Sequence, residues 1–203
     1  RTFNENATFI FELDEVPGSE QFQYGFGDGE FGTCTGDACP SAGRRGLINW
    51  AAFFDGNDSI RTETPFTEDI EYFTISTWVK ASQGTIFSYR QGDYKRFALT
   101  TNNFGVTDQM PGHSVGYPNI VSDSDWTHIV ATYENSVGLV VYINGEYHGQ
   151  TDFNANDVRH IAPFFIGSLP DGSDGLVGFI DDLRFYNTTF TAEQALDLYE
   201  RSA

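Results

Sequence analysis

The sequence has few basic residues and no long hydrophobic run, and each shortage excludes a class of protein. Eleven Lys and Arg face 29 Asp and Glu, and the formal net charge is −18. Binding to nucleic acid or to an anionic membrane surface needs basic clusters, so neither partner is expected. No apolar stretch approaches the roughly 18–20 residues that span a bilayer, which argues against membrane insertion. No basic and apolar leader opens the chain at Arg1, as expected of a mature protein or a module of a longer one.

Cysteine is also scarce, because Cys34 and Cys39 are the only two in the chain. Four residues lie between them, including a glycine, so the segment can close into a small disulfide loop worth roughly 2 kcal/mol. The alternative is half of a zinc site, but neither a second cysteine pair nor a closely spaced histidine pair completes one. We therefore expect a Cys34–Cys39 disulfide, which implies an oxidising compartment and a secreted or cell-surface location.

What the sequence does have is typical of an all-β protein. Phe, Trp and Tyr make up 16% of the chain, and there are 21 glycines. Aromatic residues favour strands and glycine favours turns. Short strand-like runs separated by turns predict a sandwich or barrel. The predicted strands are 8–13, 49–54, 59–62, 72–81, 85–90, 96–101, 113–117, 126–133, 139–143, 146–149, 164–166 and 177–186.

Local signals add a hairpin and a helix. Asn144-Gly145 stands between two alternating apolar runs, which predicts a two-residue β-turn. Residues 191–199 form one amphipathic helix that begins with a capping box of Thr191 and Gln194. The glycine-rich stretch 23–46 is expected to be irregular. No linker divides the chain, so residues 1–203 are predicted to form one domain.

Six motifs follow one another in the order of a known family. They are FELDE (11–15), FDGNDSI (54–60), FTISTWVK (73–80), WTHIVATY (126–133), VYING (141–145) and GFIDDLRFYN (178–187). Together they resemble the laminin-G-like jelly-roll domains of the concanavalin A-like lectin/glucanase superfamily. The resemblance implies an antiparallel jelly-roll β-sandwich of two sheets with one short C-terminal helix. Lectins, adhesion domains, hydrolases and lyases all use this fold, so function has to be inferred from sites.

The resemblance also implies a structural calcium site. Members of the superfamily often bind calcium where the first strand, the loop after the second strand and the last long strand meet. The matching positions here are Asp14, Gly56, Asn57 and Asp181. Calcium takes 6–8 oxygen ligands from carboxylates, carbonyls and water, which these residues can supply. The alternative is that they are solvated turn residues, since Asp and Asn are common in turns.

A glycan-binding face is expected around Trp78. Alternation along 73–80 places Thr74, Ser76, Trp78 and Lys80 on one polar face, with Trp78 as the aromatic platform for a sugar. The alternative is that the loop 103–125 covers Trp78, which then only packs. Trp50 and Trp126 are expected in the core. Neighbouring segments are expected to add Tyr89, Arg90, Tyr94, His113 and Tyr117 to the ligand-binding face.

Catalytic patterns are weak by comparison. Hydrolases of the superfamily carry two Glu and an Asp alternating on a central strand, whereas here the nearest match is 12–15 on the first strand. His128 alternates with Trp126 and Val130 and is expected to be a packed sheet residue. The sequence therefore predicts an extracellular, non-catalytic recognition module that binds polysaccharide or a cell-surface glycoconjugate and is stabilised by calcium. The alternatives are a structural or protein-binding adhesion module of a surface assembly, and, third, a polysaccharide hydrolase or lyase.

Overall fold

The structure is a computed structural model of the 203-residue chain. It describes residues 7–23, 31–47, 49–62, 71–91, 94–107, 113–135, 137–152 and 163–202.

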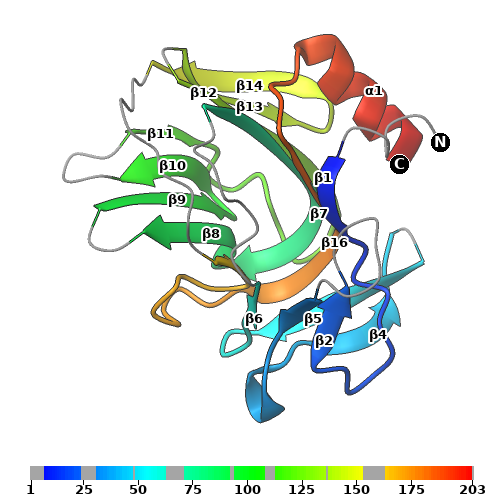
Figure 1. Ribbon diagram of the computed structural model, residues 1–203. Helices are drawn as coiled ribbons and strands as arrows, with labels where there is room; N and C mark the ends of the chain where they lie inside the picture. The colour runs from blue at the N-terminus through cyan, green and yellow to red at the C-terminus, as the bar shows by residue number, and fades with distance from the viewer. Residues whose placement is uncertain are drawn as a thin grey trace.

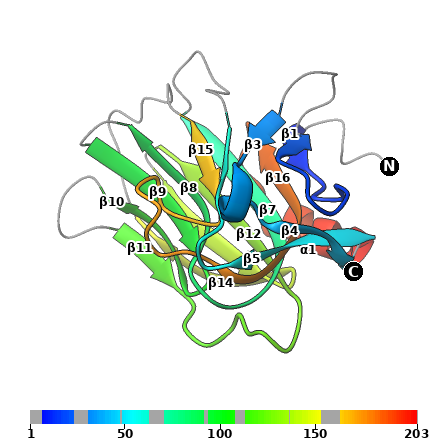
Figure 2. The same cartoon turned by 90° about the horizontal axis from the view of Figure 1, so that it is seen from below.

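Two antiparallel sheets pack face to face and form a β-sandwich (Figure 1). Sheet A runs in the order β14 (Glu146–Thr151), β13 (Gly138–Ile143), β12 (Thr127–Glu134), β7 (Tyr72–Gln83), β16 (Val177–Tyr186), β5 (Trp50–Asp55) and β4 (Ser41–Arg45), and β1 (Ala7–Phe11) also pairs with β16. Sheet B runs in the order β11 (His113–Gly116), β10 (Asn103–Thr107), β9 (Tyr94–Thr100), β8 (Thr85–Gln91), β15 (Phe164–Ile166), β6 (Ile60–Arg61), β3 (Phe31–Thr33) and β2 (Gln21–Gln23). Seen from below, β8 to β11 lie on one side of the sandwich and β4, β5 and β16 on the other (Figure 2). The predicted fold class is confirmed.

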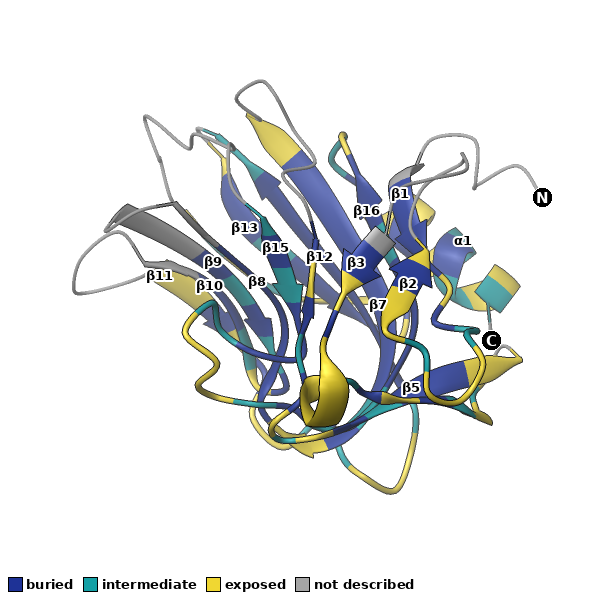
Figure 3. Ribbon diagram, turned by 60° about the horizontal axis from the view of Figure 1, so that its bottom comes forward, coloured by how far each residue is buried: buried dark blue, intermediate teal, exposed yellow. Residues whose placement is uncertain are grey.

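The main core lies between the sheets and is rich in phenylalanine. Along β7 the side chains of Phe73, Ile75 and Val79 point inward, as the period-two alternation requires. The Phe73 ring stacks on Phe185 of β16 at 5.2 Å, which ties the two longest strands of sheet A together through their side chains. Buried residues fill the middle of the sandwich, and exposed residues lie at its loops and strand ends (Figure 3).

A second, smaller core lies on the outer face of sheet A, beneath helix α1 (Ala192–Ser202). Thr191 and Gln194 form the predicted capping box: the Thr191 N–H donates to Gln194 Oε1 at 2.9 Å, and the Gln194 N–H donates to Thr191 Oγ1. Among the described residues, no helix is long and apolar enough to cross a bilayer. The residues buried under the helix are Ile10, Val130, Tyr142, Tyr186, Phe190, Ala195 and Leu198.

The stretch 23–46 is more ordered than expected. It contains β3 and β4 and a 3-10 turn at Gly36–Ala38, and β10 forms where no strand was predicted. Cys34 and Cys39 form the expected disulfide across the 3-10 turn, with their Cα atoms 5.1 Å apart. These strands were missed because each has only three to five residues and contains glycine, which is depleted in strands.

Candidate ligand-binding site

The outer face of sheet A carries a row of partly exposed aromatic side chains on neighbouring strands. Phe53 and Phe179 are paired across β5 and β16, and their rings lie 4.9 Å apart. Lys80 of β7 is the register partner of Phe179 on the other side. Trp126, directly before β12, places its ring 6.2 Å from Phe179. We call Trp126, Lys80, Phe179 and Phe53 the aromatic row.

Strand alternation fixes the direction in which the aromatic row points. The residues on either side of Phe53 and those on either side of Lys80 belong to the core between the sheets, so Phe53 and Lys80 point away from it. Phe179 is likewise next to the core residue Ile180. Each member of the row is partly exposed. The arrangement gives an apolar surface of mutually tilted rings with one ammonium group, supported by central strands of the sheet.

Helix α1 covers the next part of the same face, and there the structure corrects the expectation for Trp78. The indole is 4% exposed, its ring lies 5.6 Å from that of Tyr199, and its Nε1–H donates to Ser202 Oγ at 3.1 Å. Trp78 therefore offers no face to a sugar. Its predicted side of the sheet is right, but the cover is the helix rather than the loop 103–125.

His128 is a packed sheet residue, as predicted. It lies beside Trp78, with ring centroids 4.9 Å apart, and its Nε2 is 2.9 Å from Ser76 Oγ. Burial, together with the nearby positive charge of Arg184, lowers the pKa of His128 from its usual 6.5 to about 3. The imidazole is therefore neutral near pH 7 and closed off from solvent, which suits packing rather than acid–base chemistry.

The other residues expected on the glycan face do not gather around Trp78. Tyr89 and Tyr117 are buried in the main core, and the Tyr117 hydroxyl donates to the Thr100 carbonyl at 2.7 Å. His113 is exposed on β11, the edge strand of sheet B. The side chains of Arg90 and Tyr94 lie outside the described part of the structure. The hypothesis of one site made of these residues is wrong for Trp78, Tyr89 and Tyr117.

The four expected calcium ligands fall into two groups. Asp14 Oδ1 accepts the Trp50 N–H at 2.9 Å and Asp181 Oδ2 accepts the Leu47 N–H at 2.8 Å, so both carboxylates hold the turn between β4 and β5. Gly56 and Asn57 follow the far end of β5, roughly 17–20 Å of strand away. The prediction that Gly56 and Asn57 share one calcium site with Asp14 and Asp181 is therefore wrong.

Several oxygen atoms lie near the β4–β5 turn. A side-chain carbon at Gly46 would lie 2.5 Å from both Asp181 Oδ2 and the Trp50 carbonyl oxygen, so these two oxygens lie close to the Gly46 backbone. The described residues contain no group of three or more His, Cys, Asp or Glu placed to hold a metal. Any ion here would use two carboxylates, Asp14 and Asp181, together with carbonyl and water oxygens.

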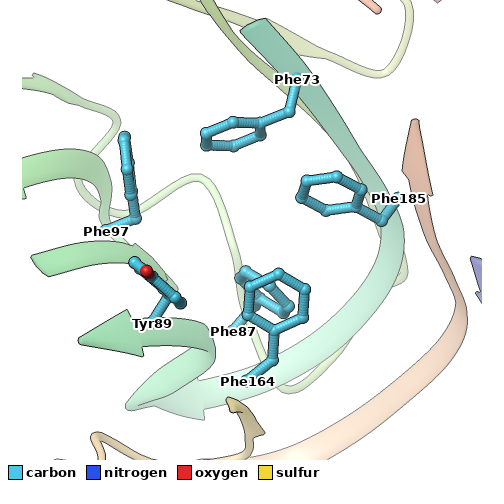
Figure 4. Close-up of a pocket in the computed structure, with 6 residues that line it drawn as sticks. All are labelled: Phe73, Phe87, Tyr89, Phe97, Phe164 and Phe185. Atoms are coloured by element: carbon cyan, nitrogen blue, oxygen red, sulfur yellow. The ribbon is translucent and has the colours of Figure 1, made fainter. Parts of the chain in front are cut away.

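The cavity between the sheets is a packing gap in the core. Its volume is about 10 Å³, close to that of one water-sized sphere, and the surface that lines it is apolar (Figure 4). Such a space holds neither a sugar nor a substrate. The side chains around it are Phe73, Phe87, Tyr89, Phe97, Phe164 and Phe185.

Sequence reasoning missed most of the aromatic row. Lys80 was placed on the correct face, whereas Trp126 was expected in the core and is partly exposed. Trp50, also expected in the core, is 51% exposed at the start of β5. The alternation of Phe53 and Phe179 with core residues was the available signal, because it puts both on the outer face.

Comparison with known proteins identifies relatives over most of the chain. The family model described as the concanavalin A-like lectin/glucanases superfamily, Laminin_G_3, matches residues 54–195. The adhesion G-protein coupled receptor V1 of Danio rerio is 25% identical over 188 residues, which cover 81% of this chain and 3% of the receptor. The chain thus corresponds to a small part of that relative.

Solved structures share the fold at lower sequence identity. Domain 4 of AbnA, a GH43 extracellular arabinanase from Geobacillus stearothermophilus, was solved in complex with arabinotriose. It superposes with a TM-score of 0.74 at 21% identity and covers 96% of this chain and 98% of that one. The receptor binding domain of botulinum neurotoxin type G has a TM-score of 0.69 at 15% identity, covering 98% of this chain and 52% of that one. At these identities the likeness concerns the fold.

Proposed function

The chain belongs to the concanavalin A-like lectin/glucanase superfamily, and we propose that it is a non-catalytic recognition module that binds a polysaccharide or a cell-surface glycoconjugate. The aromatic row on sheet A is the proposed binding surface. Sugars stack their apolar C–H faces on aromatic rings and direct their hydroxyls to polar side chains at the rim. Phe53, Phe179 and Trp126 supply the rings, and the Lys80 ammonium supplies hydrogen-bond donors.

The single observation that carries this proposal is that these rings lie side by side, partly exposed, on a rigid part of the sheet. Central strands hold side chains in place more firmly than loops do, which lowers the entropy lost on binding. Two of the structural neighbours are named as binding domains or as bound to an oligosaccharide, which is consistent with a recognition role.

A glycan array followed by calorimetric titration tests the proposal, with arabino-oligosaccharides among the first probes. Replacing Trp126 or Phe53 with alanine should weaken binding by about two- to tenfold, since each ring contributes roughly 0.5–1.5 kcal/mol of stacking. Tyr147→Ala is the matched control, because Tyr147 is 55% exposed on a different hairpin. Equal affinity of Trp126→Ala, Phe53→Ala and the parent protein would refute the aromatic row as the site.

A broad array without any hit would favour the second candidate, a protein-binding adhesion module. The relationship to an adhesion receptor supports this candidate.

The disulfide and the relationship to a receptor also support an extracellular location for the protein. Release of reducing sugar from a bound polysaccharide would contradict the non-catalytic role.

Calcium is a further part of the proposal, with Asp14 and Asp181 as its carboxylate ligands. The ion would join β1, the β4–β5 turn and β16, and so stabilise the fold by mass action. Chelation should lower the melting temperature, and added calcium should restore it. Asp181→Asn should abolish the calcium response, whereas Asn57→Ala should keep it. A melting temperature unaffected by chelator would refute the calcium site.

A further inference from the structure

The tip of the β4–β5 hairpin presents an arginine and a tryptophan directly opposite each other. Arg45 ends β4, Trp50 begins β5, and the two are register partners. Both are exposed, Trp50 to 51%. Side chains of directly opposite residues lie on the same face with Cβ atoms about 4.5–5.5 Å apart. The side chains of Arg45 and Trp50 thus leave the hairpin on the same face, from neighbouring Cβ atoms.

The backbone beneath this pair is firmly held. The Gly46 N–H donates to the Asn49 carbonyl at 3.2 Å and closes the turn. Asp14 accepts the Trp50 N–H, and Asp181 accepts the Leu47 N–H, so two other strand regions anchor the turn. A binding surface built on an anchored turn loses little conformational entropy when a ligand arrives.

The charge of Arg45 is available to a ligand. Among the described residues, arginine ion pairs are formed by Arg184 with Asp182 and by Arg201 with Asp197, whereas no described carboxylate pairs with Arg45. Arg44 precedes Arg45 in the strand and therefore points to the opposite face. Arg45 is thus a single cation beside an exposed indole, on a protein whose net charge is −18.

From this pairing we infer that Arg45 and Trp50 form a second binding site, selective for a sugar residue that carries a single carboxylate. The indole stacks on the sugar ring, and the guanidinium donates two parallel hydrogen bonds to the carboxylate. The acidic remainder of the protein repels densely charged polyanions, which selects a sparsely charged glycan. This site is separate from the aromatic row and does not depend on it.

Titration followed by nuclear magnetic resonance tests the inference, because the three tryptophans give three separate indole N–H signals. The probes are methyl glucuronoside, its carboxyl methyl ester and methyl glucoside. Methyl glucuronoside should shift the Trp50 signal at concentrations at least about tenfold lower than the two neutral sugars. Equal response to all three would overturn the inference. The Trp126 signal reports independently on the aromatic row. The experiment can therefore refute binding at Arg45 and Trp50 without refuting binding at the aromatic row, and the reverse.

Variants separate ligand binding from hairpin stability. Arg45→Ala should weaken methyl glucuronoside binding at least about tenfold, while Arg44→Ala, the matched control on the other face, should leave it unchanged. Melting temperatures are measured for both variants. Equal losses of binding in Arg45→Ala and Arg44→Ala would overturn the inference. So would a lower melting temperature for Arg45→Ala with unchanged binding, since the pair would then only stabilise the hairpin.

Discussion

At the scale of single residues, His128 shows how burial sets charge. The imidazole is 1% exposed and lies against Trp78 and Tyr199, with Ser76 Oγ as the hydrogen-bond partner of Nε2. Protonation would place a cation in this apolar layer, close to Arg184. The unfolded chain has no such restriction, so its histidine takes a proton at the ordinary pKa near 6.5.

The contribution of His128 to stability should therefore fall in mild acid. Because the folded pKa of His128 is lowered to about 3, the unfolded state binds the proton first. The contribution of neutral His128 is complete above pH 6.5 and is lost as the pH falls from 6.5 toward 3, at roughly 1.4 kcal/mol per pH unit. Urea unfolding of the parent protein and of His128→Gln between pH 7 and pH 4 should reveal this slope as the difference between the two, because the opposite slope from Asp58 is common to both. An unchanged slope in His128→Gln would contradict the assignment.

Asp58 changes the stability with pH in the direction opposite to His128, and so serves as a control. Burial raises the pKa of Asp58 from 3.8 to about 6, so the folded state binds the proton more readily than the unfolded state. Its contribution is present below pH 3.8 and is lost as the pH rises through 6. Asp58→Asn should therefore raise stability most near pH 7, whereas His128→Gln acts on the acid side.

Gly46 should not tolerate a side chain. A Cβ there would lie 2.5 Å from Asp181 Oδ2 and from the Trp50 carbonyl oxygen, so the turn or Asp181 would have to move. Gly46→Ala should lower the free energy of unfolding by about 1–3 kcal/mol, as overpacking does. Gly116→Ala is the control, because beyond the adjacent residues the nearest neighbour of a Cβ there would be Pro118 Cδ at 4.0 Å. Chemical denaturation compares the two, and equal stabilities would contradict the crowding at Gly46.

The tryptophans mark the limit of residue-level prediction. Alternation correctly put Trp78 on the outer face of its strand, because the period of two is local. What lies on top of that face depends on where the C-terminal helix docks, about 120 residues later in the chain, and no pattern around Trp78 encodes it. Trp50 is exposed for a similar reason: β5 extends past the main core at its first residue.

At the scale of elements, helix α1 decides which part of sheet A remains open. Its cap and its apolar face were both readable from the sequence, since they are local. Thr191→Ala should lower the free energy of unfolding by about 1 kcal/mol through loss of the cap. Leu198→Ala should lower it by about 2–5 kcal/mol, because Leu198 fills the layer beneath the helix.

Thermal unfolding and glycan titration of the same two variants separate stability from binding. Both variants should keep the affinity of the aromatic row, since none of its residues belongs to the layer under the helix. A loss of affinity without loss of stability would show that α1 itself contacts the ligand. Glu193→Ala, an exposed change on the same helix, is the control and should alter the stability by less than about 0.5 kcal/mol.

Strand prediction succeeded where pairing is reinforced by alternation. The runs at 164–166 and 177–186 match β15 and β16, and the Asn144-Gly145 turn has the positive φ angles of 51° and 80° that such a hairpin turn needs. The strands β2, β3 and β4 are too short for alternation to mark them. β2 pairs with β3 and β4 with β5, and the single described pair Thr33–Arg61 joins β3 to the more distant β6.

At the scale of the whole molecule, the order of the strands was implied by the family resemblance rather than by any property of the residues. β1 and β16 lie side by side although more than 160 residues separate them. Contacts over such distances depend on the complete topology of the strands. The candidate sites are formed by such contacts, so their positions depend on the topology too. The aromatic row combines residues from β5, β7 and β16 with the residue before β12, which is why no single motif contained it.

Charge acts on the molecule as a whole. A formal net charge of −18 makes the compact state repel itself, and dissolved salt screens this repulsion over about 10 Å at 0.1 M. Raising sodium chloride from 10 mM to 500 mM should increase the melting temperature by several degrees, as 1 kcal/mol corresponds to about 2–4 °C for a chain of this length. Scanning calorimetry at pH 7 measures this increase. The control is the same sodium chloride series near pH 4.3, where the formal charge approaches zero. There the salt effect should nearly vanish. A melting temperature that falls with salt at pH 7 would mean that ion pairs outweigh the general repulsion.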